Sequence, residues 1–275
     1  MKQTSFLCFL SRLRRKTIWF HGLQQEAGAS SGIGAEFVRQ LDQSFSRIDE
    51  IWMIARNVQK MEEIAATLQN KARVIGLDLE KKEQRKELEI LLEKETPEIC
   101  MLVNCAGFGL MGDFEQLDME EQLNMVELNC KALTAVTYMA IPYMVRNGRI
   151  IQLASAAAFV PQAHFAVYAA TKSYALSFSR ALQEELIPKE IYITAVCPGP
   201  VKTPFFDRAE VGGQTLALKK NFSVLPEMVV KDALIASKRR KTVTVCSLPM
   251  KLFRILCKVV PHSWILEIVE NFDKG

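Results

Sequence analysis

Short apolar segments recur along the chain, and segments with a helical pattern of apolar and polar positions separate them. Each apolar segment is five or six residues long and almost uninterrupted, which is typical of strands buried on both faces of a sheet. We expect such strands at Ile51–Ala55, Arg73–Leu77, Ile99–Val103, Arg149–Ala154, Tyr192–Cys197 and Thr242–Cys246. Strands of this kind predict a mostly parallel sheet.

The intervening segments repeat apolar residues every three or four positions, as amphipathic helices do. We expect helices from about Gly34 to Leu41 and at Val58–Asn70, Lys81–Glu95, Glu120–Met144 (bent near Pro142), Tyr168–Leu186 and Pro226–Ser237. The alternation predicts a doubly wound α/β fold of the Rossmann type. No internal repeat or linker is visible, so we assign one domain, 17–247, with an N-terminal extension, 1–16, and a C-terminal tail, 248–275.

Composition narrows the class of protein. Hydrophobic residues make up 49% of the chain, and 35 basic against 31 acidic residues leave a net charge of +4, too mild for a nucleic-acid-binding surface. The seven cysteines contain no C-x-x-C pair, so we expect free thiols, no metal site and a cytoplasmic protein. No apolar segment reaches the ~18 residues of a membrane span, although peripheral contact of the chain ends with a membrane remains an alternative.

A glycine-rich segment opens the first helix. Its spacing suits a backbone that turns tightly and approaches a diphosphate at the helix N-terminus, where free N–H groups bind anions. The expected cofactor contacts here are Gly28, Ser30, Ser31, Gly32, Ile33 and Gly34. The alternative is a glycine-rich turn that binds no ligand.

The residue that ends the next strand discriminates between nicotinamide cofactors in dinucleotide-binding folds. An acidic residue there binds the ribose 2′-OH of NAD, whereas this chain has Arg56. A guanidinium suits the 2′-phosphate of NADP. We therefore expect NADP(H) to be preferred over NAD(H), with a solvated surface arginine as the alternative.

Three residues form a candidate catalytic group. Tyr168 and Lys172 are one helical turn apart and share a face, and Ser155 follows a strand thirteen residues before the tyrosine. Tyr-x-x-x-Lys alone also occurs by chance on exposed helix faces. Here the ends of the strands before Ser155 and before Pro198-Gly199 lie at the carboxyl edge of the sheet, where α/β proteins bind ligands.

The chemistry of this group suits carbonyl reduction, which needs a proton donor beside a hydride donor. A tyrosine with a pKa near 10 is a poor acid–base catalyst at neutral pH. A lysine cation ~4 Å away, at an effective dielectric constant of about 20, contributes about 4 kcal/mol, which lowers that pKa by ~3 units. We expect Lys172 to lower the pKa of Tyr168 and Ser155 to hold the substrate oxygen.

Four motifs in order resemble the short-chain dehydrogenase/reductase family: Gly-x-x-x-Gly-Ile-Gly from Gly28, Asn-x-Ala-Gly from Asn104, Ser-x12-Tyr-x-x-x-Lys from Ser155, and Pro-Gly-Pro-Val-x-Thr from Pro198. The resemblance covers roughly residues 28–206. It implies an NADP(H)-dependent oxidoreductase acting on CH–OH groups, with a small carbonyl or alcohol substrate. It also implies a homodimer or homotetramer built through the helices Glu120–Met144 and Tyr168–Leu186, with packing of these helices within the monomer as the alternative.

The same resemblance implies individual roles. Asn129 would complete the catalytic group through a water relay to Lys172. The remaining cofactor contacts would be Asp78, Asn104, Ala106, Gly107, Tyr168, Lys172, Pro198, Gly199, Val201 and Thr203.

The segment before Gly28 departs from the family pattern, which places a buried strand there. Residues 22–27 read Gly-Leu-Gln-Gln-Glu-Ala, and burying their polar side chains without partners would cost a few kcal/mol each. Either Thr17–His21 is the first strand and an insertion follows it, or the first strand is irregular. The departure keeps a second function open, a dinucleotide-binding family member without catalysis.

Two C-terminal segments would shape the substrate site. Pro204–Leu225, which is rich in phenylalanine and leucine, lies where the resemblance implies a lid over an apolar substrate, with ordinary surface helices as the alternative. The tail from Leu248 is amphipathic and mildly basic. We expect it to pack on the domain. The alternatives are that it covers the active-site mouth, packs on a partner subunit or lies on a membrane surface. We interpret His164, four residues before Tyr168, as a polar loop residue.

Overall fold

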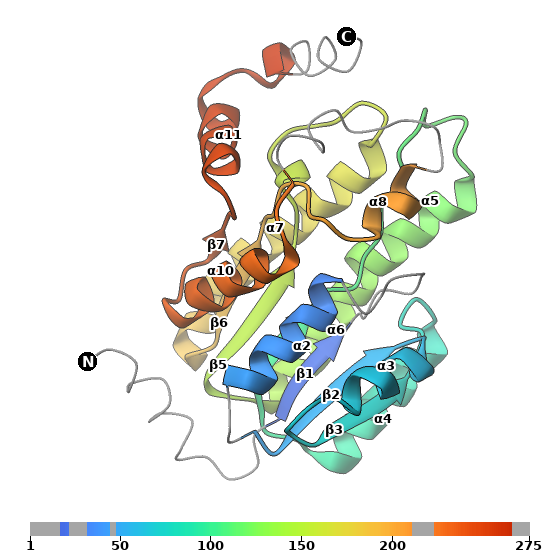
Figure 1. Cartoon of the computed structure of the whole chain (residues 1–275), viewed down its shortest axis with the longest axis vertical. Helices are drawn as coiled ribbons and strands as arrows, with labels where there is room; N and C mark the ends of the chain where they lie inside the picture. The colour runs from blue at the N-terminus through green and yellow to red at the C-terminus, as the bar shows by residue number, and fades with distance from the viewer. Residues whose placement is uncertain (1–16, 22–31, 45–47, 211–222, 266–275) are drawn as a thin grey trace.

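The computed structural model describes residues 17–21, 32–44, 48–210 and 223–265. Within them, seven parallel strands form one sheet in the order β3-β2-β1-β4-β5-β6-β7 (Figure 1). The strands are β1 (Thr17–His21), β2 (Glu50–Ala55), β3 (Ala72–Gly76), β4 (Ile99–Asn104), β5 (Met144–Leu153), β6 (Tyr192–Val196) and β7 (Val243–Thr244). The order reverses between β1 and β4, so the predicted doubly wound parallel fold is confirmed.

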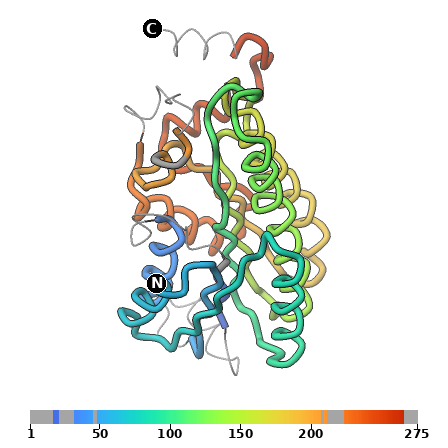
Figure 2. The backbone as a smooth tube through the Cα atoms, turned by 90° about the vertical axis from the view of Figure 1, so that its right-hand side faces the viewer, coloured from blue at the N-terminus to red at the C-terminus, as the bar shows by residue number. Residues whose placement is uncertain are grey.

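Helices cover both faces of the sheet (Figure 2). The structure has α2 (Ile33–Ser44), α3 (Val58–Ala65), α4 (Lys82–Glu95), α5 (Met119–Val126), η1 (Glu127–Ala132), α6 (Leu133–Ala140), η2 (Ile141–Tyr143), η3 (Ala156–Phe159), α7 (Ala166–Leu186), η4 (Ile187–Lys189), α8 (Phe205–Ala209), α10 (Pro226–Lys238) and α11 (Leu248–Val259). Apolar residues of α2, α3 and α10 pack on one face, and those of α4, α6 and α7 pack on the other.

β1 occupies the centre of the sheet, between β2 and β4. Ile18 and Phe20 face the α2 side, Trp19 faces the α4 side, and all three are almost completely buried. The alternation of side chains along an extended strand produces this division between two cores. Thr17–His21 is therefore the first strand, although its register against β4 shifts between Thr17 and Ile18. Residues 22–31, including the polar segment, lie outside the described part of the chain.

The long helix expected at Glu120–Met144 is divided, and the helical region runs from Met119 to Tyr143. A π-helical segment, η1, separates α5 from α6, and a 3-10 turn, η2, ends the helical region at Tyr143. Pro142 has no N–H to continue the helical bonds, and Met144 already has extended dihedral angles (φ −71°, ψ 133°). The expected bend at Pro142 was therefore wrong, because the helical region ends there and β5 begins.

A buried carboxylate explains why α3 ends at Ala65 instead of Asn70. The Asp42 side chain accepts hydrogen bonds from the backbone N–H of Gln69 at 2.9 Å and of Asn70 at 2.9 Å. The Asn70 amide donates to the same carboxylate at 2.8 Å. These bonds hold residues 69 and 70 in a turn against α2, so they cannot continue the helix.

Polar side chains also connect β4, α6 and β5 within the core. The Asn104 amide donates to Thr137 Oγ1 at 3.1 Å and to Gln152 Oε1 at 3.0 Å. Gln152 Nε2 donates to the same threonine oxygen at 2.9 Å. All three side chains are buried, so each bond avoids an unpaired polar group in the core.

Candidate active site

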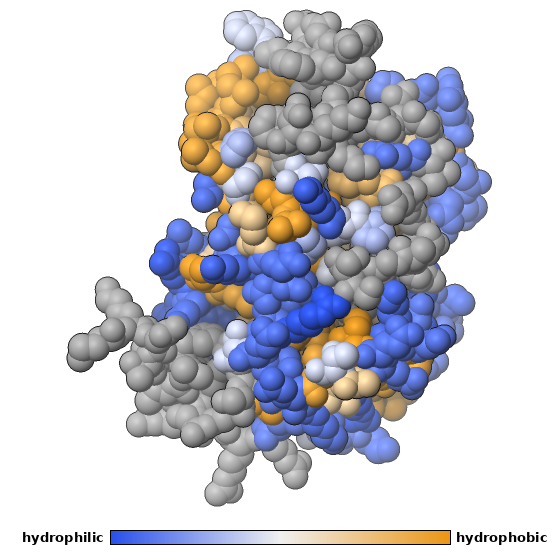
Figure 3. All heavy atoms as spheres, in the orientation of Figure 1, coloured by the Kyte–Doolittle hydropathy of each residue, from blue (hydrophilic) through white to orange (hydrophobic). Residues whose placement is uncertain are grey.

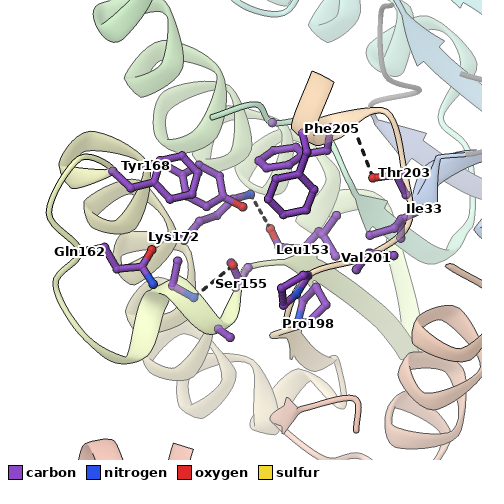
Figure 4. A pocket seen from close by; sticks show the side chains of 18 of the residues that line it. Ile33, Leu153, Ser155, Gln162, Tyr168, Lys172, Pro198, Val201, Thr203 and Phe205 are labelled. Atoms are coloured by element: carbon purple, nitrogen blue, oxygen red, sulfur yellow. Dashed lines mark hydrogen bonds between the residues drawn. The ribbon is translucent and has the colours of Figure 1, made fainter. Parts of the chain in front are cut away.

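A cavity opens at the carboxyl edge of the sheet, beyond the ends of β4, β5 and β6 (Figure 4). The start of α2, the loops after those strands, the first turns of α7 and α8, and one face of α11 form its walls. The predicted site residues that line it are Ile33, Gly34, Gly107, Ser155, Tyr168, Lys172, Pro198, Gly199, Val201 and Thr203. The structure thus brings together residues from four separate motifs.

Ser155 and Tyr168 both line this cavity. Ser155 directly precedes η3, and its Oγ accepts the N–H of Ala157 at 3.1 Å, which fixes the serine rotamer. Tyr168 lies in the first turn of α7 and is only 7% exposed. The Tyr168 side chain is therefore shielded from bulk solvent, while Ser155 is half-buried on the same cavity wall.

Lys172 lies one turn further along α7, and its ammonium group donates to the carbonyl oxygen of Leu153 at 3.0 Å. Its Nζ is 5.6 Å from the centre of the Tyr168 ring. Burial lowers the pKa of Lys172 to about 8, and the thiols around it only partly oppose this.

Burial raises the pKa of Tyr168 to about 12, although the neighbouring Ser155 hydroxyl acts in the opposite direction. This direction is opposite to the lowering expected from Lys172, because the loss of hydration dominates for the buried phenol. Tyr168 is consequently protonated at neutral pH.

Asn129 lies in η1 and holds the loop after β4 against α7. Its Nδ2 donates to the carbonyl oxygen of Phe108 at 2.9 Å and to Thr171 Oγ1 at 3.0 Å, and its Oδ1 accepts the Phe108 N–H at 3.1 Å. Gly107 has φ +155°, and a Cβ there would lie 2.7 Å from Asn129 Oδ1 and 3.1 Å from the Lys172 ammonium. The Asn129 amide thus positions the wall beside Lys172.

Aromatic rings enclose the tyrosine. Phe165 stacks on Tyr168 with 4.2 Å between ring centres, and Phe205 of α8 lies 5.4 Å from it. Met250 and Phe253 of α11 complete the apolar wall. Sequence reasoning did not single out Phe165, Met250 or Phe253. The apolar residue three positions before the tyrosine was the available signal for Phe165, but none placed the tail residues.

His164 also lines the cavity, and its Nδ1 lies 2.6 Å from Asp113 Oδ1. Its backbone has φ 55°, a left-handed conformation that is uncommon outside glycine. The pair joins the loop before α7 to the loop after β4 at the cavity edge.

Other predicted cofactor contacts do not line the cavity or lie outside the described residues. Gly28, Ser30 and Ser31 lie outside the described residues. Gly32 does not line the cavity, and its carbonyl accepts the first helical hydrogen bond of α2 from Glu36 N at 3.1 Å. Asn104 belongs to the buried network described above, and Ala106 adjoins Gly107 without lining the cavity.

Arg56 lies at the carboxyl end of β2, as expected, but two carboxylates neighbour it. Its guanidinium is 3.3 Å from Glu80 Oε1 and 3.8 Å from Asp78 Oδ2. Arg56 and Asp78, predicted as separate cofactor contacts, therefore belong to one ion-pair cluster. The Arg56 side chain remains 30% exposed, so the cluster faces solvent.

The described residues offer no sign of metal binding or of a membrane span. They contain no group of three or more His, Cys, Asp or Glu side chains arranged to bind a metal ion. None of their helices combines the length and apolar character needed to cross a bilayer.

A doubly wound sheet with a serine, a tyrosine and a lysine at its carboxyl edge defines a class of dinucleotide-fold oxidoreductases. Comparison with known proteins agrees: the profile of the short chain dehydrogenase family matches residues 27–211. The chain belongs to this family.

Individual relatives extend the comparison. An uncharacterized oxidoreductase of Staphylococcus epidermidis is 31% identical over 187 residues, which are 67% of this chain and 80% of the relative. A short-chain dehydrogenase from Sphingobium yanoikuyae in complex with NADPH is 25% identical, with a TM-score of 0.71 over 91% of this chain and 98% of that one. A 3-ketoacyl-(acyl-carrier-protein) reductase from Brucella melitensis, complexed with NADH, shares the fold at 21% identity, with a TM-score of 0.68 over 85% and 96%.

Proposed function

We propose that the protein transfers hydride reversibly between NADP(H) and an apolar carbonyl or secondary alcohol, with Tyr168 as the general acid and base. The observation that carries this proposal is that Ser155, Tyr168 and the buried Lys172 line one apolar cavity, with the Lys172 ammonium 5.6 Å from the centre of the Tyr168 ring. Solved relatives bound to NADPH and to NADH support a nicotinamide dinucleotide as the cofactor.

The walls of the cavity fit such a cofactor. Ile33 and Gly34 bring the N-terminus of α2 to the cavity edge, and its free N–H groups suit a diphosphate. Gly107 and Gly199 provide backbone surface without side chains on the opposite walls. When bound, the nicotinamide supplies the hydride. Arg56 would hold the 2′-phosphate, in competition with its carboxylate neighbours.

The residues of the site would move the proton. The protonated Tyr168 donates its hydroxyl proton to the substrate oxygen, while Ser155 donates a hydrogen bond to the same oxygen. The phenolate left behind is stabilised by Lys172, since a cation about 6 Å away contributes roughly 3 kcal/mol at an effective dielectric constant of about 20. The Asn129 amide keeps the loop after β4 against α7, beside Lys172, for this step.

Tyr168→Phe tests the proposal directly. With NADPH and a panel of apolar ketones, we expect the variant to lose on the order of a thousandfold or more in kcat/KM while it still binds NADPH, because only the proton donor is removed. Ser155→Ala should lose activity in the same assay. If Tyr168→Phe keeps most of the activity, the proposed mechanism is wrong. Dinucleotide binding without turnover by the unmodified protein would favour the non-catalytic alternative.

The cofactor preference has its own test. Fluorescence titration should give a lower Kd for NADPH than for NADH, and Arg56→Ala should remove most of that difference. Glu80→Gln serves as the matched variant, because loss of the competing carboxylate should strengthen NADPH binding and leave NADH binding unchanged. Equal affinities for both cofactors would contradict the preference.

We further infer that α5, α6 and α7 carry a homodimer contact. Leu123, Tyr138 and Tyr174 are 53%, 76% and 41% exposed on these helices. Their apolar area fits a self-complementary interface. Sedimentation velocity should detect a dimer that Tyr138→Glu dissociates, and a monomeric protein at micromolar concentration would refute this interface.

A further inference from the structure

Helix α11 packs against the domain through only one of its faces. Met250 and Cys257 are buried there, in apolar clusters with neighbouring elements that include Phe159 of η3. The opposite face carries large apolar side chains that project into solvent. These are Leu248 (68% exposed), Leu252 (59%), Ile255 (59%), Leu256 (45%) and Val259 (78%). We call these five residues the outer stripe.

The spacing of the outer stripe gives a continuous surface. Its members lie at positions i, i+4, i+7, i+8 and i+11, which fall on one side of a helix with 3.6 residues per turn. Figure 3 shows apolar surface gathered where α11 lies, at the upper left of the view. Trp264, a few residues beyond the helix, is also 64% exposed. A monomer in water gains nothing from exposing such a row of side chains.

Charge along α11 has one sign. Lys251 and Lys258 are exposed beside the outer stripe, and Arg254 lies over the Phe159 ring with 5.9 Å to its centre. The sequence from Leu248 to Ile265 contains no acidic residue. An apolar stripe with cations at its side matches the boundary of an anionic lipid layer, where apolar side chains enter the acyl region and lysines meet headgroup charges.

We propose that the outer stripe of α11 docks the protein on an anionic membrane surface. A second copy of the same face is a poorer partner, because a two-fold contact would bring lysines near lysines. Met250 and Phe253 line the cavity from the inner side of the same helix. A docked bilayer would therefore lie about one helix diameter, ~10 Å, from the cavity. The docking proposal itself does not depend on the proposed reaction.

Vesicle co-sedimentation of the full chain tests the proposal. We expect binding to vesicles of equal parts phosphatidylcholine and phosphatidylglycerol, and much weaker binding to phosphatidylcholine alone. Leu252→Ser/Ile255→Ser/Val259→Ser should weaken binding by a factor on the order of a hundred, since three partly inserted side chains are lost. Lys251→Glu/Lys258→Glu should abolish the preference for the anionic lipid. These positions are exposed, so the variants should keep the wild-type melting temperature.

The matched control removes apolar surface elsewhere. Ile90 on α4 and Met228 on α10 are 53% and 51% exposed, and Ile90→Ser/Met228→Ser should bind vesicles like the unmodified chain. Equal weakening by both sets of serine substitutions would overturn the assignment to α11. Absence of wild-type binding to either vesicle would overturn the proposal. If that absence accompanies a dimer that only the α11 substitutions dissociate, the outer stripe is a protein contact.

Discussion

Replacing Lys172 by methionine should stabilise the protein while it abolishes the proposed activity. Lys172 is only 4% exposed, and burial lowers its pKa from 10.5 to about 8. The folded protein therefore binds this proton less tightly than the unfolded chain does. Lys172 thus lowers the free energy of unfolding, in contrast to a lysine in a surface ion pair.

The magnitude follows from the two pKa values. At about pH 7 the lysine is charged in both the folded and the unfolded protein. The difference between its two pKa values then lowers the free energy of unfolding by its full amount, roughly 3 kcal/mol. Between pH 8 and 10.5 the unfolded chain holds more protons, so stability rises with pH and the penalty falls to roughly 1 kcal/mol near pH 9.5. Methionine also loses the bond to the Leu153 carbonyl, which costs roughly 1 kcal/mol. The net gain should be about 2 kcal/mol at pH 7 and close to zero at pH 9.5.

Urea unfolding of both proteins at the two pH values measures this gain, provided that the m-values agree. Lys131→Met is the control, because that side chain is 63% exposed in a surface ion pair and should change stability by less than about 1 kcal/mol at either pH. A Lys172→Met protein less stable than the wild type at pH 7, or a gain that does not change with pH, would refute the reasoning.

Three further substitutions test the scaffold. Gly107→Ala should lower the free energy of unfolding by about 2 kcal/mol and weaken dinucleotide binding, since its Cβ would lie 2.7 Å from Asn129 Oδ1; unchanged urea unfolding would contradict this. Asp42→Ala should lower the free energy of unfolding by about 2–3 kcal/mol at neutral pH. Burial raises the pKa of Asp42, but its hydrogen bonds outweigh burial and hold the pKa below 3.8. Its stabilisation is therefore lost as pH falls through that lowered value, and melting curves of variant and wild type should converge there. Gln152→Leu should lower the free energy of unfolding by about 2 kcal/mol, because the Asn104 amide loses one of its acceptors. Chemical denaturation measures this change, and an unchanged free energy of unfolding would exclude a stabilising role for Gln152.

The strands were predictable because burial on both faces demands near-continuous apolar residues. Even the displaced first strand, Thr17–His21, was visible as an apolar segment, although its distance from Gly28 left two interpretations open. Boundaries were harder, since competing contacts determine them. The carboxylate of Asp42, far away in sequence, ends α3, and nothing in the local pattern marks η1 as a π-helix.

The convergence of Ser155, Tyr168 and Lys172 on one cavity was predictable because these residues are close in sequence and follow or begin elements at the same edge of the sheet. The direction of the Tyr168 pKa was not, since it depends on how completely the surrounding apolar residues exclude water. Covering of the active-site mouth by the tail was kept as an alternative, but no pattern singled out Met250 and Phe253, because the path of the tail from β7 back to the site is a tertiary property.

The central position of β1 also governs how the chain can be made. β1 leaves the ribosome before both strands that pair with it, and the later one, β4, ends only at Asn104. At about 5–20 residues per second, translation of the intervening chain takes roughly 5–15 seconds. During that interval β2 and α2 become available to β1, but its β4 edge stays unpaired, so the nascent segment with Trp19 and Phe20 can pair with other chains. The strand that is most protected in the finished protein is thus its main aggregation hazard during synthesis, and expression yield should depend on chaperones that bind short apolar segments.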